Sequence, residues 1–172
     1  PMPKVLYDNT CFDFPAYNTN IPDIARADWF KEDLEKYRKA HGGRIPRFLN
    51  IAICNDHGAG PRPAEGYPYV CSYMADNDLA LGQVVEGLTR SPFWKNMAIF
   101  VIEDDPQSGT DHVDGHRSFC FVVSPHTRGR GVVSAFYNQS SVLHTMGRLL
   151  GIPPAHRGIA MVPGMEACFT SR

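Results

Sequence analysis

The sequence predicts an α/β fold in which a central, largely parallel sheet is flanked by helices. Three runs of strand length, residues 47–54, 97–102 and 118–123, are mostly or wholly apolar. Strands that are apolar on both faces, alternating with amphipathic helices, are typical of a parallel sheet that is covered on both sides. Two of the three runs end in acid-rich polar clusters, and ligands of such sheets bind at the carboxyl ends of the strands.

Three stretches of the chain have helical periodicity: residues 22–41, 76–91 and 140–151. The second is predicted to take its N-cap from Asp76 or Asn77, and the third from Ser140 or Ser141. Gly151 is predicted to close the third helix. The first 22 residues have no period, and we expect an ordered loop there.

Composition limits the classes of function. The 172 residues are predicted to form a single domain over 1–172, and 43% hydrophobic residues can build a core. A formal net charge of -1 gives no electrostatic reason to expect nucleic acid or an anionic membrane surface as a partner. No run approaches the roughly 20 apolar residues of a membrane span, and no signal peptide is recognisable.

Chemistry-bearing residues follow two of the predicted strands. Asp104 and Asp105 end the strand at 97–102, and adjacent carboxylates raise each other's pKa unless a cation neutralises them. The next loop has four more potential ligands within six positions: Asp111, His112, Asp114 and His116. Asp56 and His57 follow the strand at 47–54. A set of carboxylate and imidazole ligands suits zinc, manganese or iron, whereas a site for calcium alone would rarely contain imidazoles. The sequence therefore predicts a metal site with a hydrolytic function.

Simpler interpretations exist for each cluster. Surface loops commonly contain polar residues such as those at 111–116. An Asp-Asp pair and an Asn-Asp-His-Gly string are both common in turns. Asp76 and Asp78 are interpreted as helix-start residues rather than as ligands. His126, His144 and His156 have no ligand-like neighbours in the sequence and are interpreted as packed or surface side chains. Arg117 and Arg128 could contact a phosphate, but they are interpreted as ion-pair partners.

Six segments, taken in order along the chain, are similar to the motifs of a known protein family. The segments are YDNTCFDF, NDHGAG, SPFWKNMAIFVIEDD, DHV, SFCFVVSPHTR and SVLHTMGRLLGIPP. In this order they resemble the bacterial phosphoesterase family that includes phospholipases C and acid phosphatases, within the alkaline phosphatase superfamily. The resemblance implies an α/β sandwich with one or more divalent metal ions at the carboxyl ends of the sheet strands.

The resemblance also implies roles for individual residues. Asp104 and Asp105 match the paired acidic metal ligands, and His112 matches the histidine of the D-H-V motif. Asp56 and His57 match an upstream active-site pair, which would contact the substrate or the metal. His116 has no firm counterpart and stays a further candidate ligand. The metal is left open between zinc, manganese and iron.

One element of the family pattern is absent. In that family a serine or threonine nucleophile follows the first strand of the N-terminal half, and nothing before Asp56 fits this description. We therefore expect this chain to be the C-terminal part of a phosphoesterase domain, inactive without the missing N-terminal half. The parent is expected to act in the periplasm or outside the cell, on a phosphoester small molecule or a phospholipid. An unpaired sheet edge would favour self-association.

Two other functions remain open at this point. The chain could be a non-catalytic interaction or surface domain that retains the superfamily scaffold. Alternatively, it could be a short metallohydrolase that uses a metal-bound water, which predicts phosphodiesterase activity from this chain alone.

Overall fold

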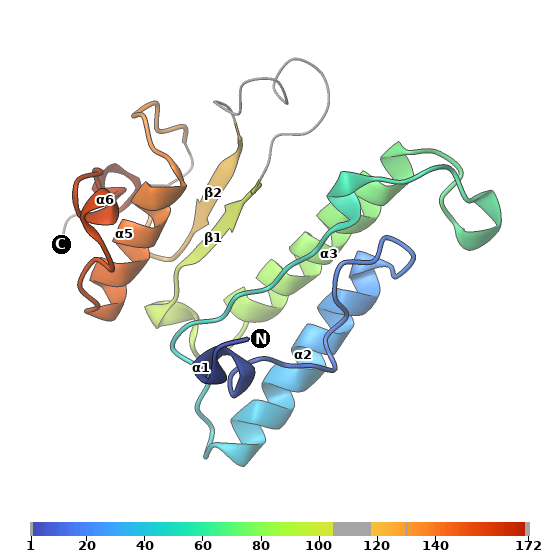
Figure 1. The fold of residues 1–172 in the computed structure, drawn as a ribbon, viewed down its shortest axis with the longest axis horizontal. Helices are drawn as coiled ribbons and strands as arrows, with labels where there is room; N and C mark the ends of the chain where they lie inside the picture. Colours follow the sequence, from blue (N-terminus) through green and yellow to red (C-terminus); the bar gives the residue numbers. More distant parts are fainter. Residues whose placement is uncertain (1, 105–117, 130, 171–172) are drawn as a thin grey trace. The chain divides into compact units, whose positions relative to one another are not determined.

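The computed structural model describes residues 2–104, 118–129 and 131–170 (Figure 1). The chain divides into two compact units, Pro1–Arg90 and Ser91–Arg172, which are described one at a time. Helices and strands are both present, so the predicted mixed α/β class is confirmed. The single domain over 1–172 stays a prediction.

The first unit is built on two long helices that lie side by side, α2 (Asp23–Ala40) and α3 (Cys71–Thr89) (Figure 1). A short helix, α1 (Lys4–Tyr7), lies in the N-terminal segment. Two 3₁₀ turns, η1 (Asn55–His57) and η2 (Pro63–Glu65), occur between the long helices, and η1 contacts α3.

The buried faces of α2 and α3 change character along their length. Buried positions on α2 follow helical spacing, as do those on α3. At one end these positions are polar, with Asp23 and Arg26 on α2 and Asp76 on α3. Further along they are apolar: Ala27, Phe30, Ala80, Val84 and Leu88. The two helices run in the same direction, because Asp23 contacts Asp76 at one level while Lys31 Nζ lies 3.4 Å from Gln83 Oε1 further along.

In its described residues, the second unit contains a two-stranded sheet and two α-helices (Figure 1). Its elements are η3 (Trp94–Asn96), β1 (Ile99–Ile102), β2 (Cys120–Val123), α5 (Gln139–Leu150), α6 (Arg157–Ala160) and η4 (Glu166–Cys168). Strands β1 and β2 pair antiparallel, from Ile99 opposite Val123 to Ile102 opposite Cys120. Val142 on α5 and Met165 are the most buried apolar side chains of this unit.

Helix α5 shows how a local polar pattern fixes a helix start. Its N-cap is Asn138, whose side-chain oxygen accepts the backbone N–H of Ser141 at 3.0 Å while the Ser141 hydroxyl faces the Asn138 N–H. The predicted caps, Ser140 or Ser141, were therefore two or three residues too late. The predicted end is confirmed, since Gly151 closes the helix with a φ of 71°, a left-handed value that suits glycine.

Two features of the predicted sheet differ in the structure. Both strands at 97–102 and 118–123 exist, but they pair antiparallel, an arrangement that needs no crossover helix between them. Within the described residues, the run at 47–54 belongs to no strand, and Phe48 is 55% exposed. An apolar run indicates burial but does not specify a pairing partner, and this explains the error.

Candidate functional site

The acidic end of β1 is held by side chains from two other segments. Asp104 lies two residues beyond the end of β1 and is exposed. Gln139, the first residue of α5, donates from Nε2 to the Asp104 carbonyl oxygen at 2.9 Å. Ser118, just before β2, donates from Oγ to the Glu103 carbonyl oxygen at 2.9 Å. The strand end is therefore tied to the beginning of β2 and to the first turn of α5.

Several predicted site residues lie outside the described part of the chain. These are Asp105, Asp111, His112, Asp114, His116 and Arg117. Of the predicted metal ligands, the structure therefore places Asp104. Among residues 2–104, 118–129 and 131–170, no group of three or more His, Cys, Asp and Glu side chains is arranged to hold a metal ion.

The second predicted pair, Asp56 and His57, lies in the first unit on the 3₁₀ turn η1. His57 is exposed, and its ring meets the edge of Tyr17 at a centroid distance of 5.5 Å and an interplanar angle of 85°. Gly58 ends the turn with a φ of 71°, and a Cβ there would lie 3.3 Å from Val70 Cγ1. The left-handed backbone conformation favours glycine, and an added Cβ would also crowd the Val70 side chain.

A buried polar network lies directly beneath this turn. The Asp23 carboxylate accepts the backbone N–H groups of Cys54 at 3.2 Å and of Asn55 at 2.7 Å. The Asn55 side chain donates from Nδ2 to Asp76 Oδ2 at 2.7 Å. Asp23 and Asn55 are fully buried, and Asp76 is 9% exposed. The backbone and the side chain of the residue before Asp56 are therefore both held by buried carboxylates.

Arg26 supplies the positive charge of this network. Its Nη1 lies 2.8 Å from Asp23 Oδ1, and the pair is almost completely inaccessible to solvent. The same guanidinium donates to the carbonyl oxygens of Ala16, Asn18 and Ile21 at 2.7 to 2.9 Å. A buried ion pair tolerates desolvation only when its remaining donors and acceptors are satisfied, as they are here. Arg26 thus connects the N-terminal loop to the buried polar network beneath η1.

Tyr67 closes one side of the network. Its hydroxyl donates to Asp76 Oδ2 at 3.2 Å, and its ring stacks on Tyr73 at 4.2 Å between centroids. Burial, together with the negative charge of Asp76, raises the pKa of Tyr67 to about 12. The phenol therefore remains a neutral donor at physiological pH.

A second arginine ties the loop after η1 to α3 and to the N-terminal loop. Arg62 donates from Nε to the Tyr73 hydroxyl at 2.6 Å and from Nη2 to the Thr19 carbonyl oxygen at 2.6 Å. Its guanidinium also lies 5.4 Å from the centroid of the Tyr67 ring. The hydrogen bond to Tyr73 is the main cause of the raised pKa of Arg62.

The structure corrects the sequence interpretation of Asp76. It was predicted to start a helix, but α3 begins five residues earlier, at Cys71, and Asp76 faces the buried network. Asp78 is exposed and is not a helix-start residue either. Four further members of the network were not singled out as site residues: Asp23, Arg26, Asn55 and Asn77. Asp and Asn are common in caps and turns, and Arg is common on exposed helix faces, so nothing in the sequence separated these residues from ordinary polar residues.

Three histidines that were interpreted as non-ligands have backbone partners. His144 Nδ1 lies 2.8 Å from the Val162 carbonyl oxygen, and His126 Nε2 lies 2.8 Å from that of Lys95. His156 Nδ1 accepts the N–H of Gly158 at 3.1 Å. These contacts agree with a structural role for all three.

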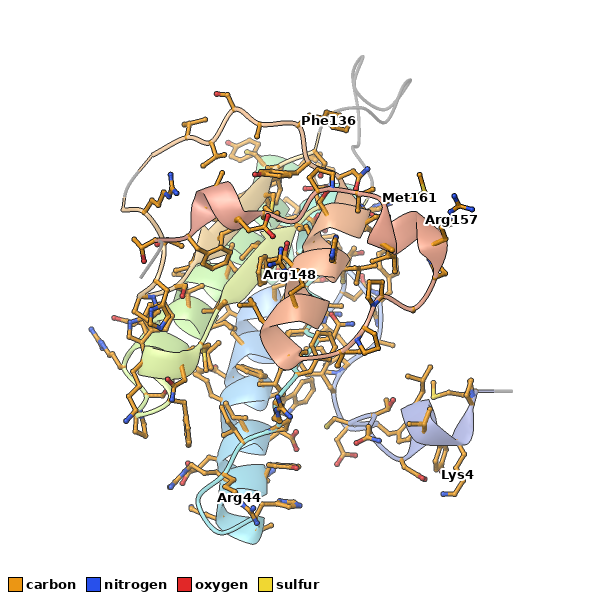
Figure 2. All side chains as sticks on the ribbon, turned by 90° about the vertical axis from the view of Figure 1, so that its left-hand side faces the viewer. Lys4, Arg44, Phe136, Arg148, Arg157 and Met161 are labelled. Carbon is orange, nitrogen blue, oxygen red and sulfur yellow. The ribbon has the colours of Figure 1, made fainter. Side chains whose placement is uncertain are left out.

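A shallow hollow of about 440 Å³ lies in the second unit. Its lining residues are Arg128, Thr145, Arg148, Leu149, Glu166, Phe169 and Thr170. Arg148, labelled in Figure 2, forms an ion pair with Glu166, and Arg128 donates from Nε to the Phe169 carbonyl oxygen at 2.7 Å. The predicted site residues that the structure describes, Asp56, His57 and Asp104, do not line this hollow.

Comparison with known proteins identifies part of the chain. Residues 71–153 match the Phosphoesterase family. The matching segment runs from the start of α3 to just beyond α5, and it includes the acidic end of β1 and the D-H-V motif. The resemblance to a phosphoesterase family is therefore confirmed for this segment. No curated protein and no solved structure matched the chain.

The phosphoesterase segment contains most of the predicted site but not all of it. Asp104, Asp105, His112 and His116 lie inside residues 71–153, whereas Asp56 and His57 precede them. The segment also includes Asp76 and Asn77, which contact the floor of η1. No helix of the described part of the chain combines the length and the apolar character that a membrane crossing requires.

Proposed function

We propose that this chain forms the metal-binding part of a metal-dependent phosphoester hydrolase. The observation that carries the proposal is the match of residues 71–153 to the Phosphoesterase family, since this segment contains the acidic end of β1 and the D-H-V motif. The proposed substrate is a phosphate monoester or diester, either a small molecule or a phospholipid head group.

Each predicted residue has a role in this proposal. Asp104, Asp105 and His112 hold the divalent metal, with His116 as a further candidate ligand. This donor set suits zinc, manganese or iron. The bound metal would polarise a phosphoryl oxygen and stabilise the charge that develops on it. Gln139 holds the backbone of Asp104, so the main chain of this first proposed ligand has a defined position.

Asp56 and His57 complete the proposed site from the turn η1. The exposed imidazole of His57 is accessible to a phosphate oxygen. The half-buried Asp56 carboxylate could bind a metal ion or accept a proton.

The attacking hydroxyl is proposed to come from sequence outside this chain. No Ser or Thr follows an apolar strand ahead of Asp56. Nucleophile and metal must act in one geometry, so the chain alone is expected to bind metal and phosphate without turnover. By the same family resemblance, we propose that the parent acts in the periplasm or outside the cell.

The experiment compares this chain with two double variants. Asp104→Asn/Asp105→Asn removes two proposed ligands, and Asp33→Asn/Asp78→Asn removes two exposed acids from helices α2 and α3. Hydrolysis of p-nitrophenyl phosphate and of bis-p-nitrophenyl phosphate is measured with zinc, manganese or iron(II). Binding of inorganic phosphate is followed by ³¹P NMR line width.

We expect metal-dependent phosphate binding by the unchanged chain and by the control variant, and its loss in Asp104→Asn/Asp105→Asn. Turnover is expected in none of the three proteins. Turnover by the unchanged chain would favour a metallohydrolase that uses a metal-bound water. Absence of both metal and phosphate binding would favour a non-catalytic domain.

A further inference from the structure

The carboxylate of Asp56 has a neighbour on α3 that the family motifs did not single out. Asn77 donates from Nδ2 to Asp23 Oδ2 at 2.9 Å and faces Asp56 Oδ1 at 3.5 Å. The first carboxylate belongs to the buried network and the second to the turn. The Asn77 amide nitrogen therefore lies between the buried carboxylate of Asp23 and the predicted active-site carboxylate of Asp56.

The orientation of this amide follows from its surroundings. An NH₂ group has two hydrogens and can serve two acceptors at once. A flipped amide would place its carbonyl oxygen against two carboxylate oxygens, so the nitrogen must face Asp23 and Asp56. The amide is also uncharged, and it therefore orients Asp56 without adding a positive charge beside it.

The Asp23 carboxylate, which contacts Asn77, is held in place by several hydrogen bonds. Asp23 is fully buried, and its carboxylate accepts from Arg26, Cys54 and Asn55 as well as from Asn77. Satisfied buried polar networks are costly to disturb. The position of the Asn77 amide is therefore set by a group that cannot easily move.

The side-chain amide of Asn55 is held through its nitrogen. Its Nδ2 donates to Asp76 Oδ2 at 2.7 Å, and its Oδ1 is buried with no hydrogen-bond partner in the described part of the chain. Turning the amide over would set Oδ1 against the Asp76 carboxylate, so this orientation persists. The turn η1 is thus fixed on its inner side by Asn55 and on its outer side by Asn77.

We propose that Asn77 is a positioning residue that holds the Asp56 carboxylate against the buried Asp23 and so orients the Asp56–His57 turn. This inference rests on the proposed function, because it gives the oriented turn a role in binding metal or phosphate. Asn77 touches neither ligand itself. It acts through Asp56.

The test uses a spectroscopic signal of Asp56 in the full chain. The ¹³Cγ chemical shift of Asp56 and the NOE between the Tyr17 and His57 rings are measured in Asn77→Ala, Asn77→Ser and Asp78→Ala. Serine keeps one hydroxyl donor, which is expected to serve Asp23 at the shorter distance and to remove the contact between residue 77 and Asp56. Asp78→Ala alters the exposed neighbouring position of the same helix.

We expect the Asp56 ¹³Cγ signal to shift and the Tyr17–His57 NOE to weaken in Asn77→Ser, while amide-exchange protection of Asn55 persists. Asp78→Ala should change none of these signals. If Asn77→Ala fails to fold, Asn77→Ser decides the outcome. An unchanged Asp56 ¹³Cγ signal in a folded Asn77 variant would overturn the proposal.

The same variants separate this inference from the proposed function. Phosphate binding by ³¹P NMR should weaken at least threefold in Asn77→Ser if the oriented turn contributes to the site. Failure of the unchanged chain to bind phosphate would contradict the proposed function, whereas the Asp56 signal would still report on positioning. Wild-type phosphate affinity in a variant whose Asp56 signal has moved would overturn the role of the turn in binding.

Discussion

Asp76 on α3 caps the N-terminus of α2 by accepting the backbone N–H of Asp23 at 2.6 Å. Pro22, which precedes α2, provides no side-chain cap, and Asp76 also faces the N–H of Ile24 at 3.4 Å. The first N–H groups of a helix need an external acceptor, and a negative charge there is favourable. A side chain 53 residues away thus performs the task that a local N-cap usually performs.

Replacing this cap should destabilise the first unit strongly. Asp76→Ala leaves the Asp23 N–H, the Asn55 amide and the Tyr67 hydroxyl without their acceptor in a buried place. Each unsatisfied buried donor costs about 1–3 kcal/mol, so a loss of about 3 kcal/mol or more is expected in urea unfolding. Asp78→Ala should change the stability by about 0.5 kcal/mol or less. Similar losses for the two variants would contradict the capping role.

Arg26→Met tests the buried ion pair. The substitution leaves the fully buried Asp23 carboxylate without its positive partner, which typically costs about 3–5 kcal/mol. Lys39→Met is the control, since Lys39 pairs with Glu35 on the exposed side of the same helix and should contribute about 1 kcal/mol or less. Chemical denaturation measures both. A loss in Arg26→Met no larger than that of the control would show that Arg26 is dispensable.

Tyr67→Phe should change how stability depends on alkaline pH. The pKa of Tyr67 is raised from 10 to about 12 in the folded protein, so the folded state holds this proton more tightly than the unfolded state. Its contribution is therefore fully present below pH 10 and is lost as the pH rises towards 12. The difference in unfolding free energy between the unchanged chain and Tyr67→Phe should shrink across this window. A difference that stays constant up to pH 12 would contradict the raised pKa, and the exposed Tyr69→Phe serves as the control.

The prediction for Gln139 concerns the other unit. Gln139→Ala removes the donor that holds the Asp104 carbonyl oxygen at 2.9 Å, so the first proposed metal ligand loses its fixed backbone. We expect stability to fall by about 1 kcal/mol or less, while metal affinity falls about tenfold. Titration with zinc or manganese measures the affinity, and Gln83→Ala on α3 is the control. Equal metal affinities in the two variants would show that Gln139 does not help Asp104 to bind the metal.

Local patterns predicted the elements of the fold well. The helix expected at 22–41 is α2, and the strands expected at 97–102 and 118–123 contain β1 and β2. The closing role of Gly151 was also correct. These features depend on hydrophobic period and on capping chemistry, which act between residues close in sequence.

Long-range contacts were beyond the reach of the same patterns. The role of Asp76 depends on α2, whose first residue precedes it by 53 positions, and no periodicity reports such a contact. Antiparallel pairing of β1 with β2, and the absence of a strand at 47–54 in the described chain, also depend on which segments meet. Of the predicted site, the structure places Asp56, His57 and Asp104, while the roles of Asp105, His112 and His116 stay predictions.

Metal content, measured by elemental analysis, tests the central claim most directly. The chain is purified in the presence of zinc, manganese and iron(II), beside Asp104→Asn/Asp105→Asn and the control Asp33→Asn/Asp78→Asn. A metal ion that copurifies with the unchanged chain and with the control, and is lost from Asp104→Asn/Asp105→Asn, is the predicted result. Equal metal content in all three proteins, or none in the unchanged chain, would contradict the proposed metal site at the end of β1.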